Sequence, residues 1–294
     1  MVELIQSLSS GVLLGLLYGI VALSFVVIYR ASRVVNLAQG EVLMIGAFLA
    51  WMAASSFGLP LYLAIPAALV MAACFGLMIE RFVFRPLTGQ PIFSIVMASI
   101  GLIILLRGAT MVIWGPATRP FPQVFPLGGV EIGPILLNTA LLIGGVITIA
   151  CAEGLNWFFM RTDAGLRLAA VAEDHTTALS MGISVRKSAI IAWVLGTTLA
   201  TVAAIIMLSG SVLGVTAAEI GFRALPVALL GGLESVRGAV IAGVVVGMAE
   251  ALASTYLDPL TNGALSQIFP FILIILVLLI RPQGLFGWKI IERI

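Results

Sequence analysis

The chain has 294 residues, of which 61% are hydrophobic and only 10% are charged, with a mean hydropathy of +1.20 and a formal net charge of +2. Soluble domains carry about 25% charged residues, so this composition excludes an ordinary soluble globular protein. With one histidine and two cysteines, we expect neither a metal site nor a disulfide framework. The sequence predicts an all-α, polytopic transmembrane protein whose apolar surface faces lipid.

Apolar runs near 20 residues, the length that a helix needs to cross a bilayer, predict seven crossings. They cover about residues 12–29, 40–57, 61–79, 92–114, 135–159, 189–209 and 267–280. Residues 224–257 would form a helix about 50 Å long, too long for a bilayer core, and Gly231, Gly232 and Gly238 interrupt them. We therefore expect a broken, re-entrant helix pair there, and seven to eight spans in a single transmembrane domain, residues 1–294.

The positions of lysine and arginine predict the orientation, because these residues collect on the cytoplasmic side. Eleven of the fifteen follow the first, third, fifth and last spans: Arg30, Arg33, Arg81, Arg85, Arg161, Arg167, Arg186, Lys187, Arg281, Lys289 and Arg293. The N-terminus is then outside and the C-terminus cytoplasmic. Alternatively, Arg30 and Arg33 mark a break inside a longer folded element, which would reverse the N-terminus. Segment 161–187 is an inside loop, and the proline-rich segment 115–134 is an outer loop.

The inside segment 161–187 is the longest stretch between spans and the richest in charge. Thr162 or Asp163 can cap a first short helix, and Asp174 can cap a second that ends at Gly182. The segment is therefore a helix–turn–helix with a modestly apolar exposed face. It is either a docking element for a soluble partner or an amphipathic connector on the membrane surface.

Glu250 is the most informative charge within the apolar spans. Gly243 and Gly247 form a GxxxG step, and Glu250 falls on the same helix face. Such faces let another backbone approach closely, and an intramembrane carboxylate is costly. Glu250 therefore faces protein or a water-lined path, either as a functional group or as a structural residue paired with an arginine.

Two other features of the spans concern packing and charge. Gly11, Gly15 and Gly19 form a double GxxxG pattern, which predicts close helix packing. Arg107 lies seven residues before Trp114, so we expect its side chain to snorkel outward. Pairing with an intramembrane carboxylate is the alternative.

Polar residues also begin the second span, at Asn36, Gln39 and Glu41. A glutamate in the first turn of a helix suits the helix dipole, which favours simple capping at the interface. The alternative is that Asn36 and Gln39 line the inner mouth of a pathway.

Four segments in this order resemble the Liv-type permeases of ABC importers, the family that imports branched-chain amino acids. They are NLAQGEVLMIGAF at 36–48, RTDAGLRLAAVAEDHTTALSMGI at 161–183, GFRALPVALLGGLESVRGAVIAG at 221–243 and RPQGLFG at 281–287. The resemblance covers nearly the whole chain. One departure is the pair Glu234 and Arg237, where many family members carry small or neutral residues.

The resemblance implies a permease subunit in the bacterial inner membrane. The resemblance also implies that this subunit works with a second homologous permease, two cytoplasmic ATPase subunits that bind ATP and Mg, and an extracytoplasmic solute-binding protein. Residues implied in ATPase coupling are Asp163, Gly165, Arg167, Glu173, Asp174, Ala178 and Gly182. Residues expected in the pathway or its gate are Asn36, Gln39, Glu41, Gly231, Gly232, Glu234, Arg237 and Glu250.

Several alternatives stay open. We expect that the chain is not its own ATPase. A phosphate-binding loop requires a lysine in a glycine-rich turn, and neither of the two lysines, Lys187 and Lys289, has that context. The solute could instead be urea, a short amide or another small polar molecule. A self-sufficient secondary transporter or channel also uses broken helices. We expect no catalytic residues, because the spans hold no pair of groups suited to acid–base or nucleophilic chemistry.

Overall fold

The structure is a computed structural model that describes residues 2–126, 128–133, 135–173, 175–261 and 265–287. The chain forms two compact units, each assembled from segments that are distant in sequence. Unit 1 comprises Met1–Val26, Pro126–Gly154 and Arg223–Ile294, and unit 2 comprises Val27–Phe125 and Leu155–Phe222. Several helices run from one unit into the other, and the single transmembrane domain stays a prediction.

Six helices of the described residues are long and apolar enough to cross a membrane. They are α1 (Val2–Ser32), α3 (Leu61–Ile79, continued to Leu87 by the short turns η2, Glu80–Phe84, and η3, Arg85–Leu87), α4 (Ile92–Trp114), α5 (Thr139–Arg161), α8 (Val185–Leu208) and α10 (Val236–Tyr256). A seventh apolar helix, α12 (Leu265–Ile280), is shorter. The predicted all-α polytopic class is confirmed.

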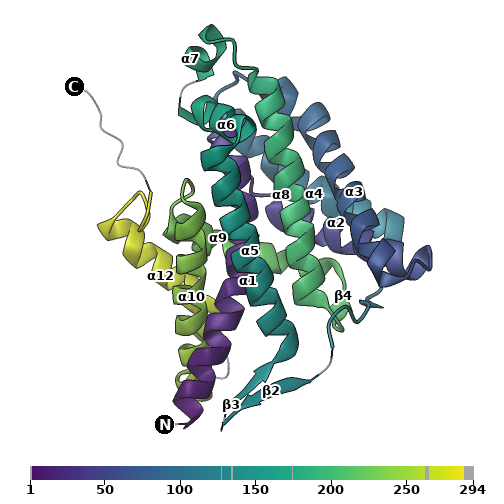
Figure 1. The fold of residues 1–294 in the computed structure, drawn as a ribbon, viewed down its shortest axis with the longest axis vertical. Coiled ribbons are helices and arrows are strands. Elements are labelled where there is room, and N and C mark those ends of the chain that lie inside the picture. Colours follow the sequence, from purple (N-terminus) through teal and green to yellow (C-terminus); the bar gives the residue numbers. More distant parts are fainter. Residues whose placement is uncertain (1, 127, 134, 174, 262–264, 288–294) are drawn as a thin grey trace. The chain divides into compact units, whose positions relative to one another are not determined.

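The shorter elements connect these helices (Figure 1). They are α2 (Gln39–Trp51) with its π-helical end η1 (Met52–Ser56), α6 (Asp163–Glu173), α7 (His175–Ser180), η4 (Val215–Ala217), α9 (Ala218–Gly231) and α11 (Asp258–Thr261). Strand β1 (Arg119–Pro120) pairs with β4 (Val212–Leu213), and β2 (Gly129–Ile132) with β3 (Ile135–Asn138), both antiparallel.

The predicted span at 135–159 begins later than expected. Its first four residues form β3, and α5 starts at Thr139. The side chain of Asn138 accepts a hydrogen bond from Ala140 N at 2.8 Å, the interaction of a residue that caps a helix N-terminus. An apolar run alone does not reveal this boundary, because Ile135, Leu136 and Leu137 suit a strand as well as a helix.

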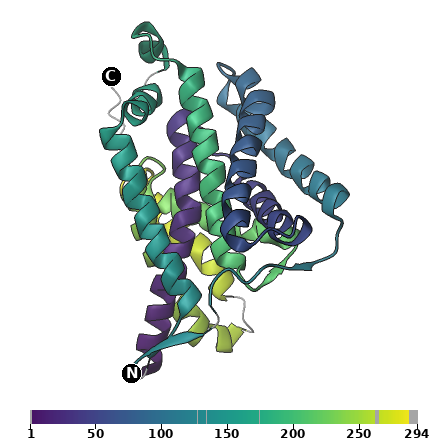
Figure 2. The same cartoon turned by 45° about the vertical axis from the view of Figure 1, so that its right-hand side comes forward.

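In unit 2, α2 is the central helix. All of its residues except Leu49 and Trp51 are buried, so this helix is covered on every side, as a helix that is apolar all round should be. Figure 2 shows α2 and α3 beside α8. Small residues permit this packing: a side chain on Gly46 would meet Thr201, and one on Gly76 would meet Thr197.

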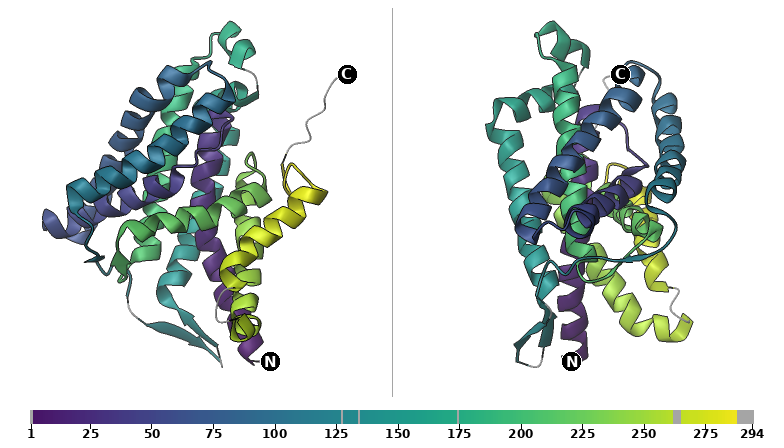
Figure 3. Two further views of the ribbon diagram at one scale, coloured as in Figure 1. Left: turned by 180° about the vertical axis from the view of Figure 1, so that it is seen from behind. Right: turned by 90° about the vertical axis from the view of Figure 1, so that its right-hand side faces the viewer.

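In unit 1, α10 packs antiparallel against the first part of α1 (Figures 1 and 3). Gly15 lies against the backbone of Gly243, Gly11 against that of Gly247, and Gly19 against Val240. The predicted close packing of the double GxxxG pattern is confirmed, and its partner is the GxxxG step of α10. The same register places the start of α10 level with about Ala22 of α1.

The two ends of α8 carry different structures within unit 2 (Figure 1). Helices α6 and α7 lie beside its first residues, and β4, paired with β1 of segment 115–134, follows its last. Ser209, next to that end, accepts hydrogen bonds from Val124 N and Phe125 N at 2.9 and 3.1 Å. A helix of 24 residues spans about 36 Å, enough to separate two faces of a bilayer.

We therefore expect cysteines at Ser180 and Thr118, both exposed, to be labelled from opposite sides of the membrane. The background should lack Cys74 and Cys151. An impermeant thiol reagent applied to intact cells should modify Thr118→Cys and spare Ser180→Cys, and inverted vesicles should give the reverse. Labelling of both from one side would contradict the predicted orientation.

Candidate functional site

The corner between α5 and α6 is fixed by Thr162, as the sequence predicted. Its hydroxyl donates to Phe158 O at 2.7 Å and accepts from Gly165 N at 3.0 Å, so it caps α6. Gly165 is buried so tightly that a Cβ there would lie 2.7 Å from Phe158 C. Only glycine lets α6 fold back this closely onto the end of α5.

The end of α7 is a glycine-terminated helix end. Gly182 has φ +76°, and Ile183 N donates to Ala178 O at 2.9 Å, the bond that joins the residue two past a helix end to its last turn. Gly182 therefore ends the second short helix, as predicted. Asp174, its predicted cap, lies outside the described residues.

The pair α6–α7 has a buried and an exposed side. Gly165, Leu168, Val171 and Ala172 of α6, and Ala178 of α7, are buried in unit 2. The exposed side carries three apolar side chains and three predicted coupling charges: Leu166, Leu179, Met181, Asp163, Arg167 and Glu173. Of the predicted coupling residues, Gly165 and Ala178 therefore hold the pair in place, and the charges face outward.

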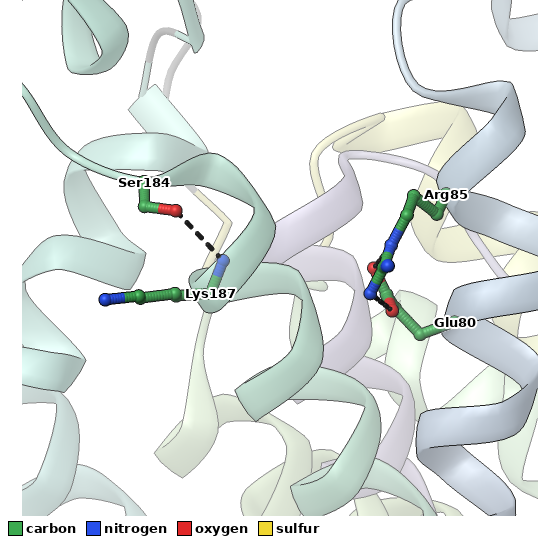
Figure 4. Close-up of polar contacts among 4 residues, drawn as sticks. All are labelled: Glu80, Arg85, Ser184 and Lys187. Atoms are coloured by element: carbon green, nitrogen blue, oxygen red, sulfur yellow. Dashed lines mark hydrogen bonds and ion pairs between the residues drawn. The ribbon is translucent and has the colours of Figure 1, made fainter.

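A cavity of about 740 Å³ lies next to this pair in unit 2. It is lined by the chain that follows α1, by residues 84–95 and by the start of α8, with Leu179 of α7 on its edge. Figure 4 shows two groups that hold its walls: Glu80 forms a bidentate pair with Arg85, and Ser184 caps α8 through Lys187 N. Leu179 is the residue of α7 that lines this cavity.

The start of α2 is held by buried amides. Asn36 Oδ1 accepts from Ala38 N at 3.2 Å, and Asn36 Nδ2 donates to Gln39 Oε1 at 3.0 Å. Gln39 Nε2 reaches Gly196 O at 3.5 Å, near the middle of α8. The second span predicted at 40–57 is therefore the short helix α2 with η1, which begins beside the middle of α8, and it is not among the six span candidates of the described residues.

Glu41 lies one turn further along α2 and is fully buried. Arg107 Nη2 of α4 donates to Glu41 Oε1 at 2.8 Å. The expected outward snorkelling of Arg107 is therefore wrong, and the alternative, a carboxylate partner, is observed. Within the described residues, neither Glu41 Oε2 nor Arg107 Nε has a hydrogen-bond partner, so the pair is incompletely satisfied.

The predicted break in 224–257 is confirmed at residues 232–235, between α9 and α10. Gly232 has φ +86°, and a Cβ there would meet Gly287 N. Ser235 caps α10 by accepting from Gly238 N at 3.0 Å, and Leu285 N donates to Leu230 O at 2.8 Å. The terminal RPQGLFG segment thus packs on this elbow.

One charge of the elbow, Arg237, has its partner outside the elbow. Arg237 makes a bidentate pair with Glu153 of α5, at 3.1 Å from Nε and 2.9 Å from Nη2. Both side chains are more than half exposed. Glu234 lies in the turn and is half-buried.

Glu250 lies in a small polar cluster of unit 1. Tyr18 Oη of α1 donates to Glu250 Oε1 at 3.3 Å, and Arg223 Nη1 of α9 lies 3.8 Å from the same oxygen. Glu250 is 8% exposed. The described residues provide no hydrogen-bond partner for its second oxygen, Oε2.

A family model described as a branched-chain amino acid transport system permease component matches residues 7–278. The chain belongs to this permease family. It is 30% identical to the high-affinity branched-chain amino acid transport system permease protein LivH of Escherichia coli, over 99% of this chain and 97% of that one. BraD of Pseudomonas aeruginosa, a permease protein of the same description, is 29% identical over 99% and 98%. The probable LivH of Methanocaldococcus jannaschii is 28% identical over 94% and 90%.

Among solved structures, PsaBC from Streptococcus pneumoniae in complex with Fab covers 94% of this chain at 16% identity and a TM-score of 0.48. That value is too low to support an argument. The family, by contrast, is established by sequence along nearly the whole chain.

Membership makes this chain a multi-pass membrane protein and the permease subunit of an ABC importer rather than an enzyme. The predicted membership of this permease family is confirmed. The residues that the sequence did not single out are the partners in tertiary pairs, above all Tyr18, Arg223 and Glu153. Of these three, only Arg223 gave a signal, because it is one of the four basic residues that do not follow the first, third, fifth or last predicted span.

Proposed function

We propose that this permease forms the inner-membrane pathway for branched-chain or other hydrophobic amino acids. A second homologous permease would complete the pathway, two cytoplasmic ATPases would bind ATP and Mg, and an extracytoplasmic binding protein would deliver the solute. The names of relatives that match the chain end to end support this substrate class. The C-terminus is proposed to be cytoplasmic.

The ATPase is proposed to dock on the exposed side of α6–α7. This helix pair carries Leu179 at 60% and Met181 at 76% exposure, flanked by charged residues, which is the composition of a protein contact with an apolar centre and a polar rim. The cavity beside α7 offers room for the pair to shift when the ATPases close. This exposed helix pair is the structural observation that supports the docking proposal, and it agrees with the family to which the chain belongs.

Leu179→Glu and Met181→Glu should weaken ATPase binding at least tenfold, because central apolar anchors dominate interfaces. Neither side chain supports the fold, so the yield of the permease should not change. Co-purification of the ATPase and leucine uptake measure the effect, and Val130→Glu, on an exposed strand of the outer loop, is the control. Normal co-purification and uptake in both variants would make α6–α7 a passive connector.

The pathway is proposed to involve the start of α2 (Asn36, Gln39 and Glu41), the elbow (Gly231, Gly232, Glu234 and Arg237) and Glu250. Support comes from depth: within unit 1, α10 begins near the level of Ala22, inside the apolar helix α1. Non-helical backbone at such depth is tolerated only when it is buried in protein or lines a water-filled cavity. Glycines in the elbow allow the two arms to approach closely.

The principal rival is a solute such as urea or a short amide, since the sequence resemblance does not separate these substrates. Binding of L-leucine, L-isoleucine, urea and acetamide by the cognate binding protein would decide, because that protein presents the solute to the permease. Calorimetry should detect the amino acids and not the amides. Binding of urea or acetamide alone would reject the proposed substrate class.

A further inference from the structure

The contacts of Glu250 are poorly matched to a structural ion pair. Both of its neighbours approach Oε1, Tyr18 Oη at 3.3 Å and Arg223 Nη1 at 3.8 Å, whereas charge-assisted hydrogen bonds measure about 2.7–2.9 Å. Glu153 and Arg237 in the same unit reach 2.9 Å with both carboxylate oxygens engaged. Glu250 is therefore held loosely by groups that leave one of its oxygens unused.

The unused oxygen is buried. Glu250 Oε2 is inaccessible and has no hydrogen-bond partner among the described residues. A buried acceptor without a partner costs about 1–3 kcal/mol, and more when charged. Glu250 differs from Glu41, whose other oxygen has a short 2.8 Å ion pair with Arg107, because neither oxygen of Glu250 has a short contact to a cation.

The helices explain why these side chains converge. Side chains lean toward the N-terminus of their own helix, and α1 and α10 are antiparallel, so Tyr18 and Glu250 lean toward each other. Arg223, in the second turn of α9, approaches the same carboxylate and is 38% exposed. The cluster therefore presents an exposed cation beside a buried anion.

We propose that Arg223 and Glu250 recognise the zwitterion of an amino-acid substrate. Arg223 would bind the α-carboxylate with its planar guanidinium, and Glu250 Oε2 would accept from the α-ammonium, with Tyr18 orienting the glutamate. Binding requires Arg223 to swing away from Glu250, which their weak 3.8 Å contact permits. This inference rests on the proposed function, and it explains how the pathway would prefer an amino acid to urea or an amide, which carry neither charge.

The test uses the complete importer, with its binding protein, in proteoliposomes. Arg223→Gln and Glu250→Gln should each lower L-leucine import per assembled complex about tenfold or more, the loss expected for one charge-assisted contact. Tyr18→Phe should have a smaller effect. The matched controls Arg81→Gln, Glu131→Gln and Tyr256→Phe, all exposed, should import as the wild type does.

A second measurement separates recognition from structure. Displacement of labelled L-leucine from the importer in nanodiscs would be compared for L-leucinamide, which lacks the carboxylate, and 4-methylpentanoate, which lacks the ammonium. Arg223→Gln should weaken the binding of 4-methylpentanoate and leave the binding of leucinamide unchanged. Glu250→Gln should weaken the binding of leucinamide and leave the binding of 4-methylpentanoate unchanged. This crossed pattern is not expected from a loss of packing.

Import of leucine by both variants at the wild-type rate would overturn the inference. So would equal loss of leucine and both analogues, or a reduced yield of complex with a normal rate per complex, since these indicate a structural cluster. A wild-type importer that moves urea or acetamide and no leucine would instead contradict the proposed function itself. The failures of the two proposals are therefore distinguishable.

Discussion

Leucine at position 15 should prevent α1 and α10 from packing. A Cβ on Gly15 would lie 2.8 Å from Val244 Cα and closer still to Gly243 O, and backbone cannot move aside as a flexible side chain can. The helices would have to separate, and Gly11 and Gly19 would lose their contacts as well. Overpacking typically lowers the free energy of unfolding by about 1–3 kcal/mol. Because the new side chain would meet backbone, we expect the loss for Gly15→Leu to lie at or above the upper end of this range.

The yield of monodisperse permease and its apparent Tm in detergent measure this loss, and both should fall sharply. Gly101→Leu is the matched control, because a Cβ there meets nothing within 4 Å and the residue is exposed on α4. Equal behaviour of the two variants would show that α1 and α10 do not pack through these glycines.

Arg107→Leu should destabilise unit 2 by about 3 kcal/mol or more. It leaves Glu41, which is fully buried, without its only ion-pair partner in the described residues. Removal of one partner from a buried pair typically costs about 3–5 kcal/mol. Because the Arg107 side chain is 42% exposed, the pair is only partly buried, which places the effect near the lower figure.

The double variant Glu41→Leu/Arg107→Leu should recover most of that stability, because exchanging both partners for apolar groups leaves no buried charge. Arg81→Leu, at an exposed arginine, is the control for loss of an arginine. Apparent Tm values of the purified permease would be compared. If the double variant were no more stable than Arg107→Leu alone, the lost stability would not come from leaving Glu41 buried without a partner.

Local features of this chain were predictable from sequence, and tertiary pairs were not. Thr162 and Gly182 act over a few residues, so their capping roles follow from spacing alone. The glycine-rich break between α9 and α10 is equally local.

Arg107 shows where sequence reasoning fails. Its partner, Glu41, is 66 residues away in the chain, and Tyr18 lies 232 residues from Glu250. Hydropathy gives the depth of a charge but not the helix beside it. The predicted start of the fifth span failed for a related reason, since an apolar run does not distinguish β3 from the first turn of a helix.

Leucine uptake into proteoliposomes, measured with and without ATP available to the ATPase subunits, tests most directly whether this permease serves an ATP-driven importer. Liposomes would contain this chain with its second permease and ATPases, and the loaded binding protein would be added outside. We predict leucine uptake that requires ATP hydrolysis, the ATPase subunits and the binding protein. The permease alone should show no uptake. Uptake by the permease alone, without ATP, would contradict the importer and identify a self-sufficient transporter or channel.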